Sequence, residues 1–166
     1  MSLQLDGTSG VLGNSGAFIA GTAVASTSGT SITFTGIPSW VKRVTVMFNG
    51  VSTNGTSDLL VQIGSGSVTT SGYASGAGNR GGDSSSTAGF ILSRQLGATD
   101  TVSGNELICL IGSNTYTSSH TLKTPSAPFF GGGNSPALSG ALDRVVITTV
   151  NGTDTFDAGT INILYE

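Results

Sequence analysis

The single histidine of the chain, His120, follows two serines, Ser118 and Ser119. A hydroxyl nucleophile needs a neighbouring base, usually histidine, which a carboxylate holds in place. Neighbours in sequence do not have the geometry of such a triad, and the chain contains no G-x-S-x-G motif for a nucleophilic serine. The pattern therefore favours a solvated loop histidine, with contact to a ligand as the second interpretation and catalysis as the third.

The other residues that could bind metals or act as acids form no known constellation. A zinc site usually takes four His and Cys side chains, and the chain has one of each, His120 and Cys109. Cys109 lies in an apolar run, so we expect a buried, unreactive thiol. Asp154 and Asp157 do not belong to a D-x-D-x-D-G calcium loop, and Glu106 is the one acid in an apolar setting. We predict that the protein is not an enzyme and needs no cofactor or metal.

Residues 76–81, GAGNRG, match the dinucleotide motif G-x-G-x-x-G in letters. That motif works only between a strand and a helix, because the helix N-terminus meets the pyrophosphate. Here a Ser/Gly run precedes the glycines and GDSSS follows them. We therefore expect no nucleotide site.

The composition predicts an all-β protein with a surface of hydroxyls and amides. Only 9% of the 166 residues are charged, the net charge is −3, and 26 residues are glycine. The six basic residues are scattered, so no basic patch can neutralise phosphates or anionic lipids. The 37% of hydrophobic residues favour a folded domain, and no long stretch has a helical apolar period. We expect neither nucleic-acid binding nor membrane insertion.

The strongest strand signal lies in residues 40–64. Apolar residues recur at every second position from Val44 to Phe48, as in a strand with one face on a core. The dipeptides Asn49–Gly50 and Asn54–Gly55 are typical of turns, and an apolar run at 59–63 follows. This order predicts a hairpin or a pair of adjacent antiparallel strands.

Further strand patterns lead to a fold prediction. Ile32 and Phe34 alternate with hydroxyl residues, and apolar runs occur at 90–92, 105–112, 143–150 and 160–165. We predict one domain with an antiparallel β-sandwich, jelly-roll-like. Its expected core residues are Trp40, Val44, Val46, Phe48, Leu60, Ile108, Leu110, Val146 and Ile163.

Residues 1–29 form a weakly apolar arm, and residues 30–166 form the sandwich domain. The arm lacks the apolar density to fold alone, so we expect it to add a strand to the main domain or to pair with another chain. Its first residues carry no basic segment of the kind found in secretory signals. We expect a cytosolic protein, or one that leaves the cell by another route, such as inside a virion.

Two long polar, Gly-rich segments, 64–88 and 113–139, interrupt the strand patterns. Loops on a rigid scaffold often carry binding sites. Aromatic residues in them could stack on sugar rings, and polar ones could bond to sugar hydroxyls. Phe129 and Phe130 could stack in this way, but anchoring of their own segment in the core is the favoured interpretation for both. The predicted receptor-binding residues are Tyr73, Asn79, Arg80, Asp83, Tyr116 and His120.

The segments LQLDGTSGV (3–11), IPSWVKRVTVMFNGVSTNGTSDLLVQIG (37–64) and TFDAGTINILYE (155–166) resemble tail-fibre and related virion-fibre proteins of tailed bacteriophages and prophages. The resemblance implies a β-sandwich head, a homotrimer displayed on a virion, that attaches to a host surface glycan or protein. It also implies assembly in the host cytoplasm and contact of the arm with other virion proteins. It carries over no defined functional residue.

Two other interpretations stay open. One is a capsid decoration or baseplate protein without receptor binding, and the other is a carbohydrate-binding module outside phage.

Overall fold

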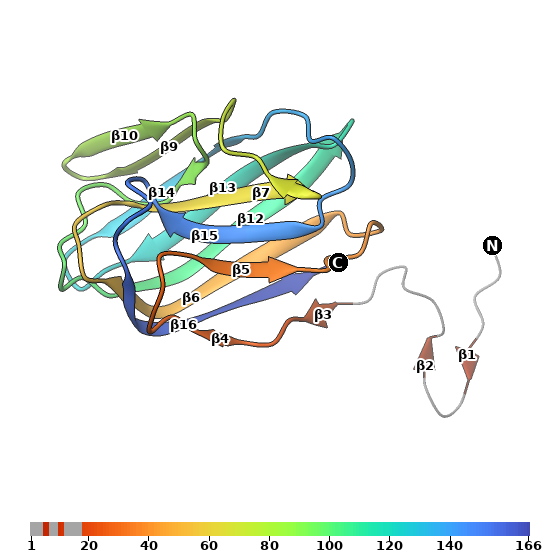
Figure 1. Ribbon diagram of the computed structural model, residues 1–166, viewed down its shortest axis with the longest axis horizontal. Coiled ribbons are helices and arrows are strands. Elements are labelled where there is room, and N and C mark those ends of the chain that lie inside the picture. Colours follow the sequence, from red (N-terminus) through yellow and green to blue (C-terminus); the bar gives the residue numbers. More distant parts are fainter. Residues whose placement is uncertain (1–4, 7–9, 12–17) are drawn as a thin grey trace.

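The computed structural model describes residues 5–6, 10–11 and 18–166. Residues 18–166 fold into two antiparallel sheets that pack face to face as a β-sandwich, which confirms the predicted fold class (Figure 1). No helix in the described part of the chain has the length and apolarity needed to cross a membrane.

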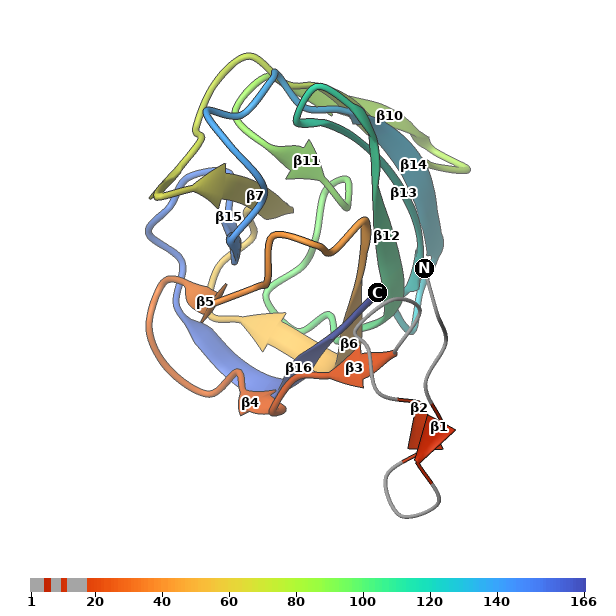
Figure 2. The ribbon, with the colours of Figure 1, turned by 90° about the vertical axis from the view of Figure 1, so that its right-hand side faces the viewer.

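The larger sheet has nine strands and the smaller sheet has five. The large sheet runs in the order β10 (Gly82–Ser86), β9 (Ala74–Asn79), β14 (Pro128–Asn134), β13 (Thr115–Lys123), β12 (Val102–Gly112), β6 (Arg43–Thr53), β16 (Phe156–Tyr165) and β3 (Ile19–Ala20), with β4 (Val24–Ala25) also paired to β16. The small sheet runs in the order β11 (Phe90–Ile91), β7 (Leu59–Ser65), β15 (Arg144–Thr149) and β5 (Ile32–Thr35), with β8 (Ser67–Val68) paired to β7. The large sheet curves around the small one (Figure 2).

Alternating apolar residues on both sheets form one core between them. In β6 the buried positions are Val44, Val46 and Phe48, as the sequence predicts, and in β5 they are Ile32 and Phe34. β-Branched and aromatic side chains suit such a half-buried pleated surface. Trp40 packs against one end of the core, where its ring lies 6.1 Å from that of Tyr165.

A β-bulge explains how β6 stays half-buried over eleven residues. Asn49 and Gly50 together face Ser103 of β12, and Gly50 has a positive φ of 63°. The extra residue shifts the alternation by one position, so that Val51 points inward after Phe48. The Asn49–Gly50 dipeptide is therefore a bulge within a strand, and its prediction as a turn is wrong.

The predicted pairing of the two strands in 40–64 is also wrong. β6 lies in the large sheet and β7 in the small sheet, where its neighbours are β15, β11 and β8. Their side chains meet across the core instead of sharing a hydrogen-bonded ladder. Val146, expected in the core, is only half-buried, because Val145 and Ile147 are the inward residues of β15.

The Gly-rich segments 64–88 and 113–139 are mostly strands, and their prediction as loops is wrong. They contain β8, β9 and β10, and β13 and β14, respectively. β9 and β14 pair with each other, so the two segments lie side by side in the large sheet.

Part of the N-terminal arm belongs to the sandwich. β3 and β4 both pair with β16 and extend the edge of the large sheet. Nearer the N-terminus, β1 (Leu5–Asp6) pairs antiparallel with β2 (Gly10–Val11). The predictions for residues 1–4, 7–9 and 12–17 lie outside the described residues.

Candidate functional site

The outer face of the large sheet carries two cross-strand rows, here called the polar face, in which small and polar residues outnumber four large apolar ones. Strand register aligns the residues of each row across the sheet. The first row is Leu164, Thr45, Leu107, Ser119, Gly132, Gly76 and Ser85. The second row is Asn162, Met47, Asn105, Thr121, Phe130, Gly78 and Asp83.

Two adjoining hollows lie on the polar face. The first has a volume of about 380 Å³ and lies over β6, β12 and β13. The second, of about 540 Å³, lies over β9 and β10. Ser119 of the first hollow is the cross-strand partner of Gly132 of the second, so the two form one continuous surface. Both volumes fall in the range of roughly 300–1,000 Å³ that is usual for sites of small ligands.

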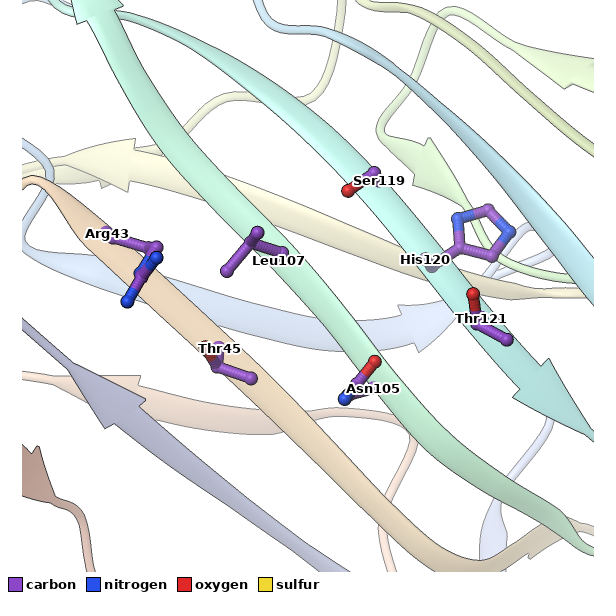
Figure 3. Close-up of a pocket in the computed structure, with 7 residues that line it drawn as sticks. All are labelled: Arg43, Thr45, Asn105, Leu107, Ser119, His120 and Thr121. Carbon is purple, nitrogen blue, oxygen red and sulfur yellow. The ribbon is translucent and has the colours of Figure 1, made fainter.

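Figure 3 shows how the first hollow is lined. The lining residues come from three neighbouring strands, with Arg43 at one end: Arg43, Thr45, Asn105, Leu107, Ser119, His120 and Thr121. Hydroxyl, amide and guanidinium groups supply both donors and acceptors, which suits a ligand rich in hydroxyls.

Phe130 gives the polar face an exposed aromatic ring. Its side chain is 57% exposed, and its cross-strand neighbours are Thr121 and Gly78. The small neighbours leave the ring open to solvent next to Thr121, which lines the first hollow. Its chain neighbour Phe129 is buried in the core, so the prediction that both rings are anchored there holds for Phe129 alone.

Arg43, at the end of the hollow, forms an ion pair with the carboxylate of Glu166. The pair neutralises the cation and fixes the guanidinium beside Thr45. Elsewhere on the two rows the one charged residue is Asp83, at the far end. This face therefore offers mainly neutral hydrogen-bonding groups.

Three of the predicted receptor-binding residues are buried, and their expected position on exposed loops is wrong. Tyr73 and Tyr116 are 2% and 3% exposed. The Tyr73 hydroxyl accepts a hydrogen bond from the Ile63 amide at 2.9 Å, and the Tyr116 hydroxyl accepts one from the Leu142 amide at 3.1 Å. Burial also raises the pKa of Tyr73 to about 12. Both phenols anchor the core, because each satisfies a buried backbone donor.

His120 is the third of these residues and is 5% exposed. Figure 3 shows its ring extending from β13 toward β14. It lies close to Gly131, where an added Cβ would come within 2.7 Å of the imidazole Cε1. Burial lowers the pKa of His120 to about 4, so the ring is neutral at pH 7.

The other three predicted residues lie at the β9–β10 hairpin. Asp83 is exposed at the end of the second row, and Arg80 is exposed at the turn. The side chain of Asn79 accepts a hydrogen bond from the Gly81 amide at 2.8 Å, which closes this turn. The GAGNRG segment is therefore a strand and its turn, and receptor contact by these three residues stays a prediction.

Glu106, Ser118 and His120 meet in the core but do not form a catalytic triad. The Ser118 hydroxyl donates to Glu106 Oε1 at 2.6 Å, whereas both nitrogens of His120 have no hydrogen-bond partner among the described residues. In a triad the histidine stands between the nucleophile and the acid. Here the acid binds the hydroxyl directly, inside a packed core.

The described residues also contain no group of three or more His, Cys, Asp or Glu side chains that could hold a metal ion.

Residues 105, 107, 119 and 121 of the polar face did not stand out in the sequence, whereas Phe130 was a possible stacking residue for which anchoring in the core was favoured. The signal that could have found them is the alternation of Tyr116, Ser118, His120 and Leu122, which places Ser119 and Thr121 on the outside. Comparison with known proteins adds no family: no family model, no curated protein and no solved structure matches the chain. The resemblance to virion fibres therefore stays a prediction.

Proposed function

We propose that the protein is an attachment module that binds a cell-surface glycan on the polar face, in the setting of a phage virion fibre. The observation that carries the proposal is the exposed ring of Phe130 beside a hollow lined by neutral hydroxyl and amide groups. A sugar ring has an apolar face of C–H groups and a rim of hydroxyls. An aromatic ring can cover the apolar face, while Asn105, Ser119 and Thr121 can bond to the rim.

The shape of the polar face favours an extended glycan over a single sugar. The two hollows adjoin across β13 and β14, and glycines at 76, 78 and 132 keep the surface between them low. A chain of sugars can therefore lie across several strands. Because the rows carry little charge, the proposal favours a neutral glycan.

A glycan array, followed by titration with the best ligand, tests this proposal. Phe130→Ala should weaken binding by about fivefold or more, as truncation of a central aromatic contact costs more than about 1 kcal/mol. Asn105→Ala should also weaken binding. Val150→Ala is the matched control, because Val150 is an exposed apolar residue in the turn after β15, away from the polar face. Unchanged affinity in Phe130→Ala would contradict the proposal.

We extend the proposal to assembly as a homotrimer through the N-terminal arm. β3 and β4 lie at the edge of the large sheet, and Phe18 and Val24 there have exposed side chains. An exposed strand edge with apolar side chains is a surface on which another chain can pair. Light scattering should give three times the chain mass at micromolar concentration, and a monomer would contradict this part of the proposal.

A further inference from the structure

The buried carboxyl and imidazole lie directly behind the first hollow. Glu106 and His120 are cross-strand partners in the β12–β13 ladder and are both buried, and His120 also borders the hollow. In sequence, Glu106 is flanked by Asn105 and Leu107, and His120 by Ser119 and Thr121. All four flanking residues line the hollow. The same two strands therefore carry the ligand surface on one face and a titratable pair on the other.

The cluster of Glu106, Ser118 and His120 contains buried polar atoms without hydrogen-bond partners among the described residues. Ser118 bonds to one carboxyl oxygen of Glu106, but Oε2 of Glu106 and both nitrogens of His120 have no hydrogen-bond partner in the described part of the chain. Glu106 is fully buried. Among the described residues, an ionised carboxylate in this place would have one oxygen without a hydrogen-bond partner, which is costly in a low-dielectric core.

The surroundings offer no compensating charge. In the same inward row, Glu106 and His120 lie between Val46 of β6 and Gly131 of β14. The strands of the small sheet face the cluster with apolar side chains, including Val61, Ile63, Val145 and Ile147. Glu106 contributes to the raised pKa of the nearby Tyr73, whose phenol is neutral at ordinary pH.

These conditions fix the proton positions near neutral pH. Burial raises the pKa of Glu106 from its ordinary value of 4.5 to about 8, although the Ser118 bond opposes the rise. Glu106 is therefore mostly protonated at pH 7, and His120 is neutral. Because the folded state holds the Glu106 proton and the unfolded state has lost it, stability falls as the pH rises from about 4.5 to about 8.

We propose that Glu106, Ser118 and His120 form a proton-operated switch for the polar face. When Glu106 releases its proton to solvent, the buried carboxylate displaces β12 and β13 from the core and deforms the hollow on their outer side. The switch itself is independent of the ligand, whereas its effect on glycan binding rests on the proposed function. By linkage, a ligand that needs the undistorted hollow binds better to the protonated form.

Urea unfolding of the wild type and Glu106→Gln between pH 5 and 8.5 tests the switch. Glutamine keeps the shape and still accepts the Ser118 hydrogen bond, but it cannot ionise. The ratio of the wild-type to the variant folding constant should fall roughly tenfold per pH unit up to about pH 8. Asp157→Asn is the matched control, because Asp157 accepts a hydrogen bond from Ser52 but is exposed. The ratio of the wild-type folding constant to that of Asp157→Asn should change far less between pH 5 and 8.5.

Two NMR measurements on the same samples decide the structural part. The amide signals of Asn105, Leu107, Ser119 and Thr121 should shift with a midpoint near pH 8 in the wild type and lose this midpoint in Glu106→Gln. If the variant fails to fold, the side-chain carboxyl carbon of Glu106 in the wild type is followed instead. A carboxyl midpoint near 4.5, a constant ratio of folding constants, or the same amide midpoint in the variant would overturn the switch.

The affinity for the array-selected glycan gives the functional readout. It should fall between pH 6.5 and 8.5 in the wild type and stay level in Glu106→Gln. Equal pH dependence in the two proteins would overturn the link to the polar face. If no glycan binds at any pH, the proposed function fails, and the unfolding and NMR results still decide the switch.

Discussion

Phe48→Ala is expected to lower the free energy of unfolding by about 3–5 kcal/mol, the usual cost of truncating a buried phenylalanine. Phe48 is buried in the middle of the large sheet, with Gly104 and Ile161 as its cross-strand neighbours. The loss combines the transfer of a large apolar side chain with the cavity that it leaves between the sheets. Urea unfolding followed by the fluorescence of Trp40 measures it.

Phe130→Ala is the matched control, since it removes the same atoms from an exposed position on the same sheet. We expect its stability to stay within about 0.5 kcal/mol of the wild type. The two variants should therefore affect different properties: Phe48→Ala lowers stability, and Phe130→Ala weakens ligand binding. A loss below about 1 kcal/mol in Phe48→Ala would contradict the core position of β6.

Gly131→Ala is expected to destabilise the protein by about 1–3 kcal/mol, as overpacking of a filled core does. An added Cβ at Gly131 would lie 2.1 Å from the Gly76 carbonyl oxygen and 2.7 Å from the His120 ring. The neighbouring strand and the imidazole would both have to move. Thermal and urea unfolding measure the cost.

Gly76→Ala on the adjacent strand β9 is the control. There the nearest atom to an added Cβ is the Ser84 carbonyl oxygen at 3.4 Å, an ordinary contact. We expect this variant to match the wild type or exceed it slightly, because alanine restricts the unfolded chain. Equal stability of the two variants would mean that His120 does not pack against β14.

The strands that carry β-branched and aromatic residues were predictable from the sequence. Alternation at Ile32 and Phe34, at Val44 to Phe48 and at Ile161 to Tyr165 correctly marked strands with one buried face. Such side chains give a period of two that needs no knowledge of the neighbouring strand. The end of each strand and the strand that pairs with it were harder to predict. The bulge at Gly50 continues β6 beyond its expected end, and β6 and β7 lie in different sheets.

The candidate site was not predictable in the same way, because glycine and serine conceal the strand period. In β14 the run Gly131–Asn134 has no apolar alternation, yet β13 and β9 hold it on both sides. Tertiary pairing thus overrides the low strand propensity of glycine. The sequence therefore predicts binding residues on loops, whereas the structure places the exposed ring of Phe130 on a sheet.

His120 was predicted to be solvated, but it is buried. Its polar, serine-rich neighbours favoured a solvated loop, but Tyr116 and Leu122 on the same face of β13 are buried with it. The imidazole fits in the core because Gly131 of β14 has no side chain at the position beside it. The sequence alone does not show that β14 pairs with β13. The pairing of Glu106 with His120 was also not predictable, because it depends on the register between β12 and β13.

Glycan binding on the polar face is tested by mapping amide shift changes when the array-selected glycan is added to ¹⁵N-labelled protein at pH 6. The largest changes should occur at Asn105, Ser119, Thr121 and Phe130 on β12, β13 and β14, and they should disappear in Phe130→Ala. Changes confined to β5, β7 and β15 of the small sheet would contradict it.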